Sequence, residues 1–235
     1  MYIGDYLGRR TIYSPETLAL VDAGKTPELR LTYAQLNDRA NRLAHALHDL
    51  GVGHGDRVAI LALDGVEHLD LLFACGKLGA IHTALNWRLH WRELQQILAE
   101  VTPTVLIYDD AFRDSIAELA QVHYPVRHWI HLDGPGIPGS QEFNALLTGS
   151  SAAPCTCEAL VEEDIAAIVF TGGTTGLPKG ARISHRQIAW NALNSVIHDV
   201  NRDDVYLNVF PLFHVGGLFV YTLPQIIMGG TTVLL

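Results

Sequence analysis

Apolar residues along the first 132 positions follow two alternating spacings. In the segment that begins at Thr32, apolar residues recur every three or four positions, as on one face of a helix: Leu36, Ala40, Leu43 and Leu47. Short unbroken apolar runs, which are typical of strands buried on both faces, separate such segments. The pattern predicts helices over 32–51, 66–79, 92–101 and 113–122, and strands over 58–62, 80–84, 105–108 and 126–132. This repeated alternation favours the α/β class, with a mostly parallel sheet flanked by helices.

The pattern changes after residue 132. Gly, Pro and Ser residues are frequent over 133–163, which predicts a surface excursion, and a short apolar strand follows over 165–170. We therefore expect two units, an α/β subdomain over 1–163 and a second, C-terminally incomplete one over 164–235. In the second unit, Ser184 is expected to cap a helix that runs to about Val200. The final residues, Thr231 to Leu235, are expected to form a strand at a sheet boundary with an exposed edge.

The segment from Thr171 to Gly180, TGGTTGLPKG, has the composition of a phosphate-binding loop. Its glycines allow close approach of oxygen atoms, backbone amides can form an anion nest, and threonines and a lysine add donors. The lysine lies three positions after Gly176, so the spacing excludes a Walker A loop. Gly51-Val52-Gly53-His54-Gly55 precedes a strand, so it does not fit a dinucleotide fingerprint. From composition alone, a surface turn remains an alternative for 171–180.

His214 is a second candidate, because it lies in a Pro-Leu-Phe-His-Val-Gly-Gly run over 211–217. An aromatic residue beside two glycines is typical of a pocket wall with space for a ligand. The alternative is a core histidine whose ring nitrogens bond to the backbone. The apolar stretch from Val215 to Met228 is interrupted by Gly216, Gly217 and Pro224 and is shorter than a membrane span, so it predicts a buried helix or pocket wall.

Charge and cysteine content narrow the function classes. The formal net charge is −9 with no basic cluster, which argues against a nucleic-acid partner. Three cysteines without a C-x-x-C pair indicate a reducing compartment rather than a disulfide framework. The histidine pairs His45/His48 and His128/His131 lack a third ligand of suitable spacing, so no metal site is expected. No secretory signal follows Met1, and a cytoplasmic location is expected.

The 171–180 loop, followed by Ile183-Ser184-His185, resembles the signature T-S-G-T-T-G-x-P-K-G of the adenylate-forming superfamily. Nine of ten positions agree, and Gly172 stands where the family has serine. The resemblance extends over the whole chain. It includes the segments at 31–37, 55–60, 77–80, 85–89 and 211–217, of which 86–89 and 211–217 most resemble acyl-CoA synthetases for fatty or aryl acids.

The resemblance implies a two-step reaction. A carboxylic acid and ATP, with Mg²⁺, give an acyl-adenylate and pyrophosphate, and the thiol of CoA then displaces AMP. Phosphate contacts would come from Thr171, Gly172, Gly173, Thr174, Thr175 and Gly176. Lys179 and Thr175 would assist catalysis, and the acid would lie against Phe213, His214, Gly216 and Gly217.

The family's adenine-binding segments, magnesium ligand and mobile lysine would follow Leu235. We therefore expect an N-terminal fragment that is inactive alone. Alternatives are a non-catalytic nucleotide-binding module or an adenylation domain that loads a carrier protein. A homo-oligomer and the identity of the acid are left open.

Overall fold

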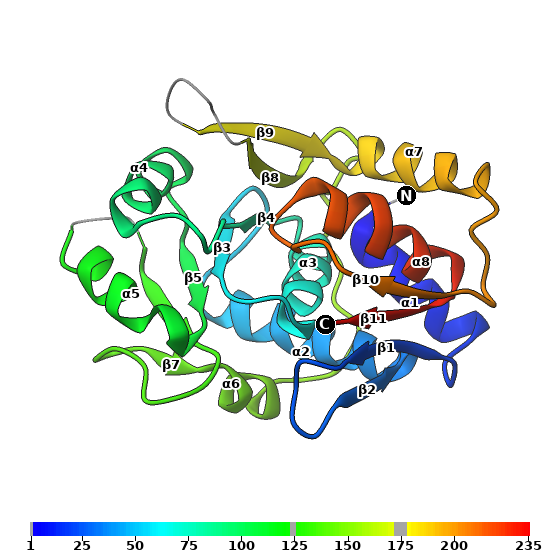
Figure 1. Cartoon of the computed structure of the whole chain (residues 1–235), viewed down its shortest axis with the longest axis horizontal. Coiled ribbons are helices and arrows are strands. Elements are labelled where there is room, and N and C mark those ends of the chain that lie inside the picture. The colour runs from blue at the N-terminus through cyan, green and yellow to red at the C-terminus, as the bar shows by residue number, and fades with distance from the viewer. Residues whose placement is uncertain (1, 123–125, 172–177) are drawn as a thin grey trace.

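The computed structural model describes residues 2–122, 126–171 and 178–235, which form two sheets and the helices around them (Figure 1). The larger sheet has the strand order β7-β6-β5-β3-β4-β8-β9. All neighbouring strands in it run parallel except β8 and β9, which form an antiparallel hairpin. The predicted α/β class is therefore confirmed. The bounds are β3 Arg57–Leu61, β4 Ile81–Ala84, β5 Val105–Tyr108, β6 His128–His131, β7 Gln141–Glu142, β8 Ile165–Thr171 and β9 Lys179–Ser184.

The side chains of the larger sheet alternate between two cores. Val58 and Ile60 pack on one face with residues of α2, α3 and α6, whereas Ala59 and Leu61 pack on the other face with residues of α4 and α5. This period of two is the natural alternation of a strand, and because both faces are covered, β3 and β5 are almost entirely apolar. The helices are α2 Tyr33–Asp49, α3 Val66–Leu78, α4 Trp91–Val101, α5 Arg113–Ala120 and α6 Phe143–Gly149.

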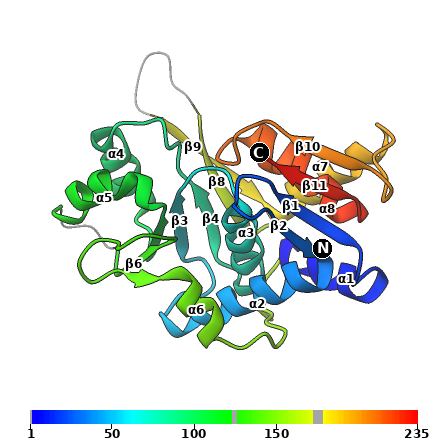
Figure 2. The ribbon, with the colours of Figure 1, turned by 60° about the horizontal axis from the view of Figure 1, so that its bottom comes forward.

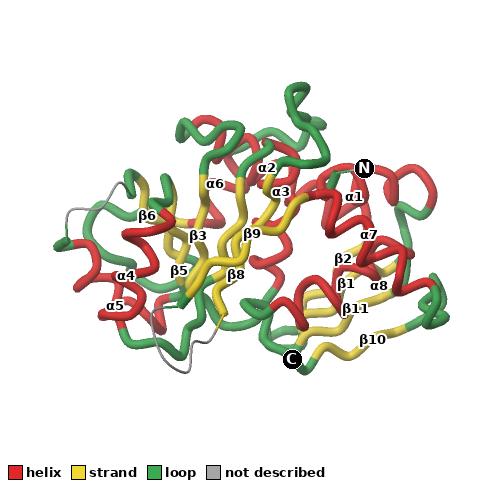
Figure 3. Tube along the Cα trace, turned by 90° about the horizontal axis from the view of Figure 1, so that it is seen from above, coloured by secondary structure: helices red, strands yellow, loops and turns green. Residues whose placement is uncertain are grey.

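A second, four-stranded sheet was not predicted from the sequence. Its order is β10-β11-β1-β2, with β1 Leu18–Asp22, β2 Leu29–Thr32, β10 Val205–Asn208 and β11 Thr231–Leu234. Strand β11 lies between β10 and β1, so the expectation that the last strand forms an exposed edge is wrong. The missing partner is β1, which comes from the other end of the chain. Figure 3 shows the two sheets as separate groups of strands.

The expected surface excursion over 133–163 is also partly structured. It contributes strand β7 and helix α6, whose Phe143 and Leu147 are buried in the core. The 133–163 segment is mostly polar and small, so its composition did not indicate that Phe143 and Leu147 would be buried. In each sheet, a strand that precedes residue 163 pairs with a strand that follows it. The division into two units at residue 163 stays a prediction.

Capping residues set the start of two helices as expected. Thr32 Oγ1 accepts a hydrogen bond from Gln35 N (3.3 Å), and Gln35 Oε1 accepts one from Thr32 N (2.9 Å). Ser184 and Gln187 form the same reciprocal pair at the start of α7, His185–Val196. Helix α7 ends before the predicted Val200. The apolar stretch that follows His214, predicted as a buried helix or a pocket wall, is helical and only partly buried, with Val220 and Tyr221 exposed. It consists of a π-helix over Gly216–Thr222 and α8 Leu223–Met228.

Helix α3 lies at the centre of the molecule, beside the strands of the larger sheet and near those of the smaller one (Figure 2). Its residues from His68 to Leu78 are all buried. Helix α1, Ile3–Tyr13, packs against it at a close approach between two glycines, because a Cβ atom on Gly76 would lie 2.7 Å from Gly4 N. In the described part of the chain, no helix is long and apolar enough to cross a membrane.

Burial of His185 predicts a loss of stability in acid. The ring is 1% exposed, and its Nδ1 accepts a hydrogen bond from Ile3 N at 3.2 Å. Burial lowers the pKa of His185 to about 4. Its neutral form therefore stabilises the fold fully above pH ~6.5, the unfolded-state value, and that contribution is lost as the pH falls towards 4. The shift corresponds to about 3 kcal/mol.

Urea unfolding at pH 7.5 and 4.5 measures this loss. We expect His185→Asn, whose amide oxygen can accept the same bond, to lose less stability than the wild type between the two pH values. His48→Asn, at an exposed position, is the control and should keep the wild-type loss. Equal losses in the wild type and His185→Asn would contradict the assignment.

Candidate functional site

The β8–β9 hairpin holds both ends of the predicted phosphate loop. Thr171 is the last residue of β8 and lies opposite Lys179, the first residue of β9, and its Oγ1 donates a hydrogen bond to the Lys179 carbonyl oxygen at 3.4 Å. Both residues are exposed. The loop therefore begins and ends at one tip. The predicted site residues Gly172, Gly173, Thr174, Thr175 and Gly176 lie outside the described residues.

The position of β8 in the sheet determines where this tip lies. Strand β8 runs parallel to β4, so the end of β8 at Thr171 lies at the same edge of the sheet as the end of β4 at Ala84. In open α/β sheets, ligands bind in the crevice outside the carboxyl ends of the strands. The hairpin tip therefore lies at the edge where a ligand is expected.

The 211–217 segment forms a turn that is tied to the same edge. Leu212 N donates to Asp64 Oδ1 at 2.7 Å, and Asp64 lies shortly after the carboxyl end of β3. His214 is exposed rather than buried in the core, and its Nδ1 accepts a hydrogen bond from Gly216 N at 3.1 Å. Gly217 is buried, because the backbone of the turn folds over it. Among the predicted acid-binding residues, His214 is thus the exposed one.

An aromatic cluster joins this turn to the end of β4. The rings of Phe213 and Trp87 meet edge to face, with their centroids 6.3 Å apart. The Arg88 guanidinium lies over both rings, with its Cζ 4.9 Å from the Trp87 centroid and 5.7 Å from the Phe213 centroid. Because Trp87 follows β4, which pairs with β8, both predicted segments lie at one edge of the sheet.

Three residues at this edge were not predicted as site residues: Asp64, Trp87 and Arg88. Each follows the carboxyl end of a parallel strand, and that position is the signal that could have identified them. Trp87 Nε1 is buried, and no hydrogen-bond partner for it is found among the described residues.

A cavity of about 450 Å³ beside this cluster is acidic. The carboxylates that line it form hydrogen bonds or an ion pair with other groups of the protein. Asp64 accepts a hydrogen bond from Leu212 N, and Asp22 accepts one from Val66 N at 2.9 Å. Glu67 forms an ion pair with Lys25 at 2.9 Å. Burial raises the pKa of Asp22, and hydrogen bonds from the backbone offset part of that shift. A cavity lined by carboxylates disfavours anions, so we do not assign phosphates or a substrate carboxylate to it. The described residues also include no group of three or more His, Cys, Asp or Glu side chains placed to hold a metal ion.

Comparison with known proteins identifies the family. The model of the AMP-binding enzyme family matches residues 10–235. The chain belongs to the AMP-binding enzyme family. This result confirms the resemblance to adenylate-forming enzymes that the sequence indicated.

Curated relatives of this AMP-binding protein include CoA ligases. It is 38% identical over 244 residues to an indoleacetate–CoA ligase of Aromatoleum aromaticum, covering 100% of this chain and 45% of that protein. It is 34% identical over 238 residues to a feruloyl-CoA synthase of an Amycolatopsis species, covering 99% and 43%. The chain thus spans about half the length of the curated relatives it matches.

Solved structures agree with the fold throughout the chain. The inhibitor-bound N-terminal domain of FACL13 from Mycobacterium tuberculosis has a TM-score of 0.90 and 32% identity, with coverage of 100% of this chain and 57% of that one. ATP-bound MatB from Rhodopseudomonas palustris has a TM-score of 0.85 and 31% identity, with coverage of 100% and 45%. The AMP-binding chain therefore has the fold of the corresponding part of these proteins.

Proposed function

We propose that this chain provides the phosphate loop and part of the acid pocket of an AMP-forming acyl-CoA synthetase. The observation that carries the proposal is the pairing of Thr171 with Lys179, which holds the ends of the TGGTTG loop at the carboxyl edge of the larger sheet. The family match and the names of the relatives, which include CoA ligases, support it.

The first step joins the acid to AMP. A carboxylate oxygen attacks the α-phosphorus of ATP, a P–O bond forms, and pyrophosphate leaves with the electrons of the broken bond. Backbone amides of Gly172 to Gly176 and the hydroxyls of Thr171, Thr174 and Thr175 would hold the β- and γ-phosphates, and the Lys179 ammonium would neutralise part of their charge. The loop's contribution is positioning and charge stabilisation rather than covalent chemistry.

The acid would bind beside the 211–217 turn. His214 is exposed there, Phe213 provides an aromatic wall that Trp87 supports, and Gly217 allows the close approach of the Pro211 backbone that shapes the turn. In the second step, the CoA thiol attacks the acyl carbon of the adenylate and a C–S bond forms. The C–O bond to the phosphate breaks, AMP leaves with its electrons, and the thiol proton is released. An aromatic wall suits fatty or aryl acids, and the choice of CoA over a carrier protein rests on the relatives' names.

Mg²⁺ would accompany ATP, with a ligand that we expect outside this chain. The described residues offer no group of three or more His, Cys, Asp or Glu side chains that could hold the ion. When bound to ATP, the ion would balance the charge of the phosphates. We further propose a cytoplasmic location, supported by three cysteines that form no disulfide.

Replacement of Lys179 tests the loop assignment. The test enzyme joins residues 1–235 to the part of the indoleacetate–CoA ligase that follows its matched segment. We expect Lys179→Ala and Thr175→Ala to lower the rate of acid-dependent pyrophosphate–ATP exchange about tenfold or more, because each removes a contact that strengthens as charge develops. The KM for the acid should change less.

Arg30→Ala is the matched control, because Arg30 is an exposed cation on β2, the edge strand of the smaller sheet. It should keep the exchange rate of the parent. If both loop variants show unchanged kinetics for ATP, the loop assignment is wrong. The 235-residue chain alone should show no exchange, and robust exchange would contradict the proposal that further segments are needed.

A further inference from the structure

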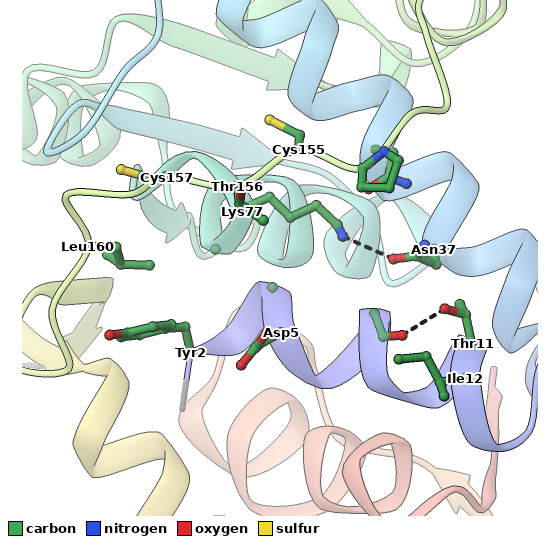
Figure 4. Close-up of a pocket in the computed structure, with 15 residues that line it drawn as sticks. Tyr2, Asp5, Thr11, Ile12, Asn37, Lys77, Cys155, Thr156, Cys157 and Leu160 are labelled. Atoms are coloured by element: carbon green, nitrogen blue, oxygen red, sulfur yellow. Dashed lines mark hydrogen bonds between the residues drawn. The ribbon is translucent and has the colours of Figure 1, made fainter.

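A second cavity, of about 330 Å³, lies away from the candidate site between α1, the end of α3 and the 154–160 segment. Figure 4 shows Lys77 of α3 crossing it, with Cys155 and Cys157 on one side and Tyr2 and Asp5 on the other. Asp5, Ile12 and Thr156 are exposed, so the cavity opens to solvent. Nothing in the proposed reaction uses these residues.

The Lys77 side chain is an unusual lining group. The residue is 7% exposed, and Gly4 of α1 packs so closely that a Cβ there would lie 2.8 Å from Lys77 Cγ. Its Nζ donates to Asn37 Oδ1 at 2.9 Å, and no carboxylate pairs with it within 4.0 Å among the described residues. A buried amine whose partner is a neutral amide has little to stabilise its charge. Accordingly, burial lowers the pKa of Lys77 to about 8, despite the opposing effects of Cys155 and Asp5.

The chain has only two other lysines, and neither has this environment. Lys25 Nζ lies 2.9 Å from Glu67 Oε1, and although burial acts in the opposite direction, the carboxylates of Glu67 and Asp22 raise the pKa of Lys25. Lys179 is exposed at the hairpin tip. Near neutral pH, Lys77 is therefore the lysine whose surroundings most favour the neutral, nucleophilic amine.

We propose that Lys77 is an acylation site that takes a short acyl group from an acyl thioester. The neutral Nζ attacks the thioester carbonyl carbon, an N–C bond forms, the C–S bond breaks, and the thiol leaves with the proton that nitrogen loses. The product is an uncharged amide, which suits a buried position better than an ammonium does. The apolar side chains of Ile12 and Leu160, which line the cavity, can accommodate the acyl chain.

Acyl thioesters are the product class of the proposed function, and the source of the donor rests on that proposal. The reactivity of Lys77 does not, because preformed acetyl-CoA can be supplied without ATP. Failure of the exchange assay and failure of the acylation assay are therefore distinguishable.

The experiment incubates the 235-residue chain with acetyl-CoA at pH 8 and follows the three lysines by peptide mass spectrometry. Lys77 should be acetylated about tenfold faster than Lys25, although the Lys25 side chain is 43% exposed. It should also react faster than the exposed Lys179. Acetylation of Lys77 at or below the rate of Lys179 would overturn the proposal.

Asn37→Asp provides a variant of nearly the same shape. It places a carboxylate at the position of the Asn37 oxygen, which should raise the pKa of Lys77 and slow its acetylation at pH 8 about tenfold, with recovery by pH 10. The other titratable groups that face the amine are Tyr2 and Asp5 from α1, and Cys155 and Cys157 from the 154–160 segment. Asp38→Asn, at an exposed neighbouring position, is the control and should react like the wild type.

Gly8→Leu tests the cavity itself. No atom lies within 4 Å of a Cβ built on Gly8, which lines the cavity, so the leucine should fill it without disturbing the backbone and should slow the reaction. Thermal unfolding verifies that each variant is folded. Unchanged acetylation of Lys77 in folded Asn37→Asp and Gly8→Leu would show that neither the amide partner nor the cavity matters, and the proposal would be wrong.

Discussion

Alanine at Gly217 is expected to lower the free energy of unfolding by about 3 kcal/mol, the upper part of the range for overpacked sites. A Cβ there would overlap the Pro211 carbonyl oxygen and would lie 2.7 Å from the Phe210 carbonyl oxygen. These are backbone atoms, which cannot rotate away as a side chain can. The turn is also held at Leu212 by Asp64 and at Phe213 by Trp87, so relief of the clash would disturb the aromatic cluster. Urea unfolding measures the loss, and near-ultraviolet circular dichroism reports on the cluster.

Gly216→Ala is the matched control one residue earlier. A Cβ at Gly216 meets only the His214 ring, with Nδ1 at 3.2 Å, and a side chain can move by the few tenths of an ångström that are needed. Its cost should stay below about 1 kcal/mol. Equal losses at the two positions would mean that the backbone of the turn adapts, and that Gly217 is not required by close approach.

The second large effect is expected at the contact between α1 and α3. Gly76→Ala would place a Cβ 2.7 Å from Gly4 N and 3.0 Å from Ile3 Cβ. The two helices would have to separate, and buried contacts of Ile3 and Leu7 with the core would weaken. We expect a loss of about 3 kcal/mol in the free energy of unfolding, measured with urea.

Gly8→Ala is the control on the same helix pair. Gly8 also lies in α1, but a Cβ there meets no atom within 4 Å. Alanine is favoured over glycine inside a helix by up to about 1 kcal/mol, so this variant should be as stable as the wild type or more so. If Gly76→Ala were as stable as Gly8→Ala, α1 and α3 would not be in close contact at Gly76.

The larger sheet was predictable because its signals are local. Strands β3 and β5 are short, mostly apolar runs. Thr32 and Ser184 mark the starts of their helices, because each forms a capping pair with a glutamine three residues later. The predicted segments around Thr171 and Lys179 could be placed at the sheet edge for the same reason, since a loop after a parallel strand emerges at its carboxyl end.

The smaller sheet and the aromatic cluster were not predictable in this way. Strand β1 is five residues long and ends in Asp22, a buried carboxylate that accepts a hydrogen bond from Val66 N of α3. Its partner β11 is near the other end of the sequence. The edge-to-face contact of Phe213 with Trp87 likewise joins distant segments, and no spacing along the chain encodes such a contact. Local sequence patterns therefore did not predict the contacts between residues that are far apart in the chain.

The pairing of β1 with β11 also constrains the order in which the protein can fold during synthesis. Leu20 pairs with Thr232, so β1 leaves the ribosome long before its neighbour exists. Until then, β1 and β2 form only a two-stranded ribbon, which is marginally stable alone. The N-terminal segment must therefore wait for residues 231–234, with an open strand edge that chaperones can recognise. A ribosome-stalled chain ending before residue 231 should be far more sensitive to protease at β1 than one in which β11 has emerged.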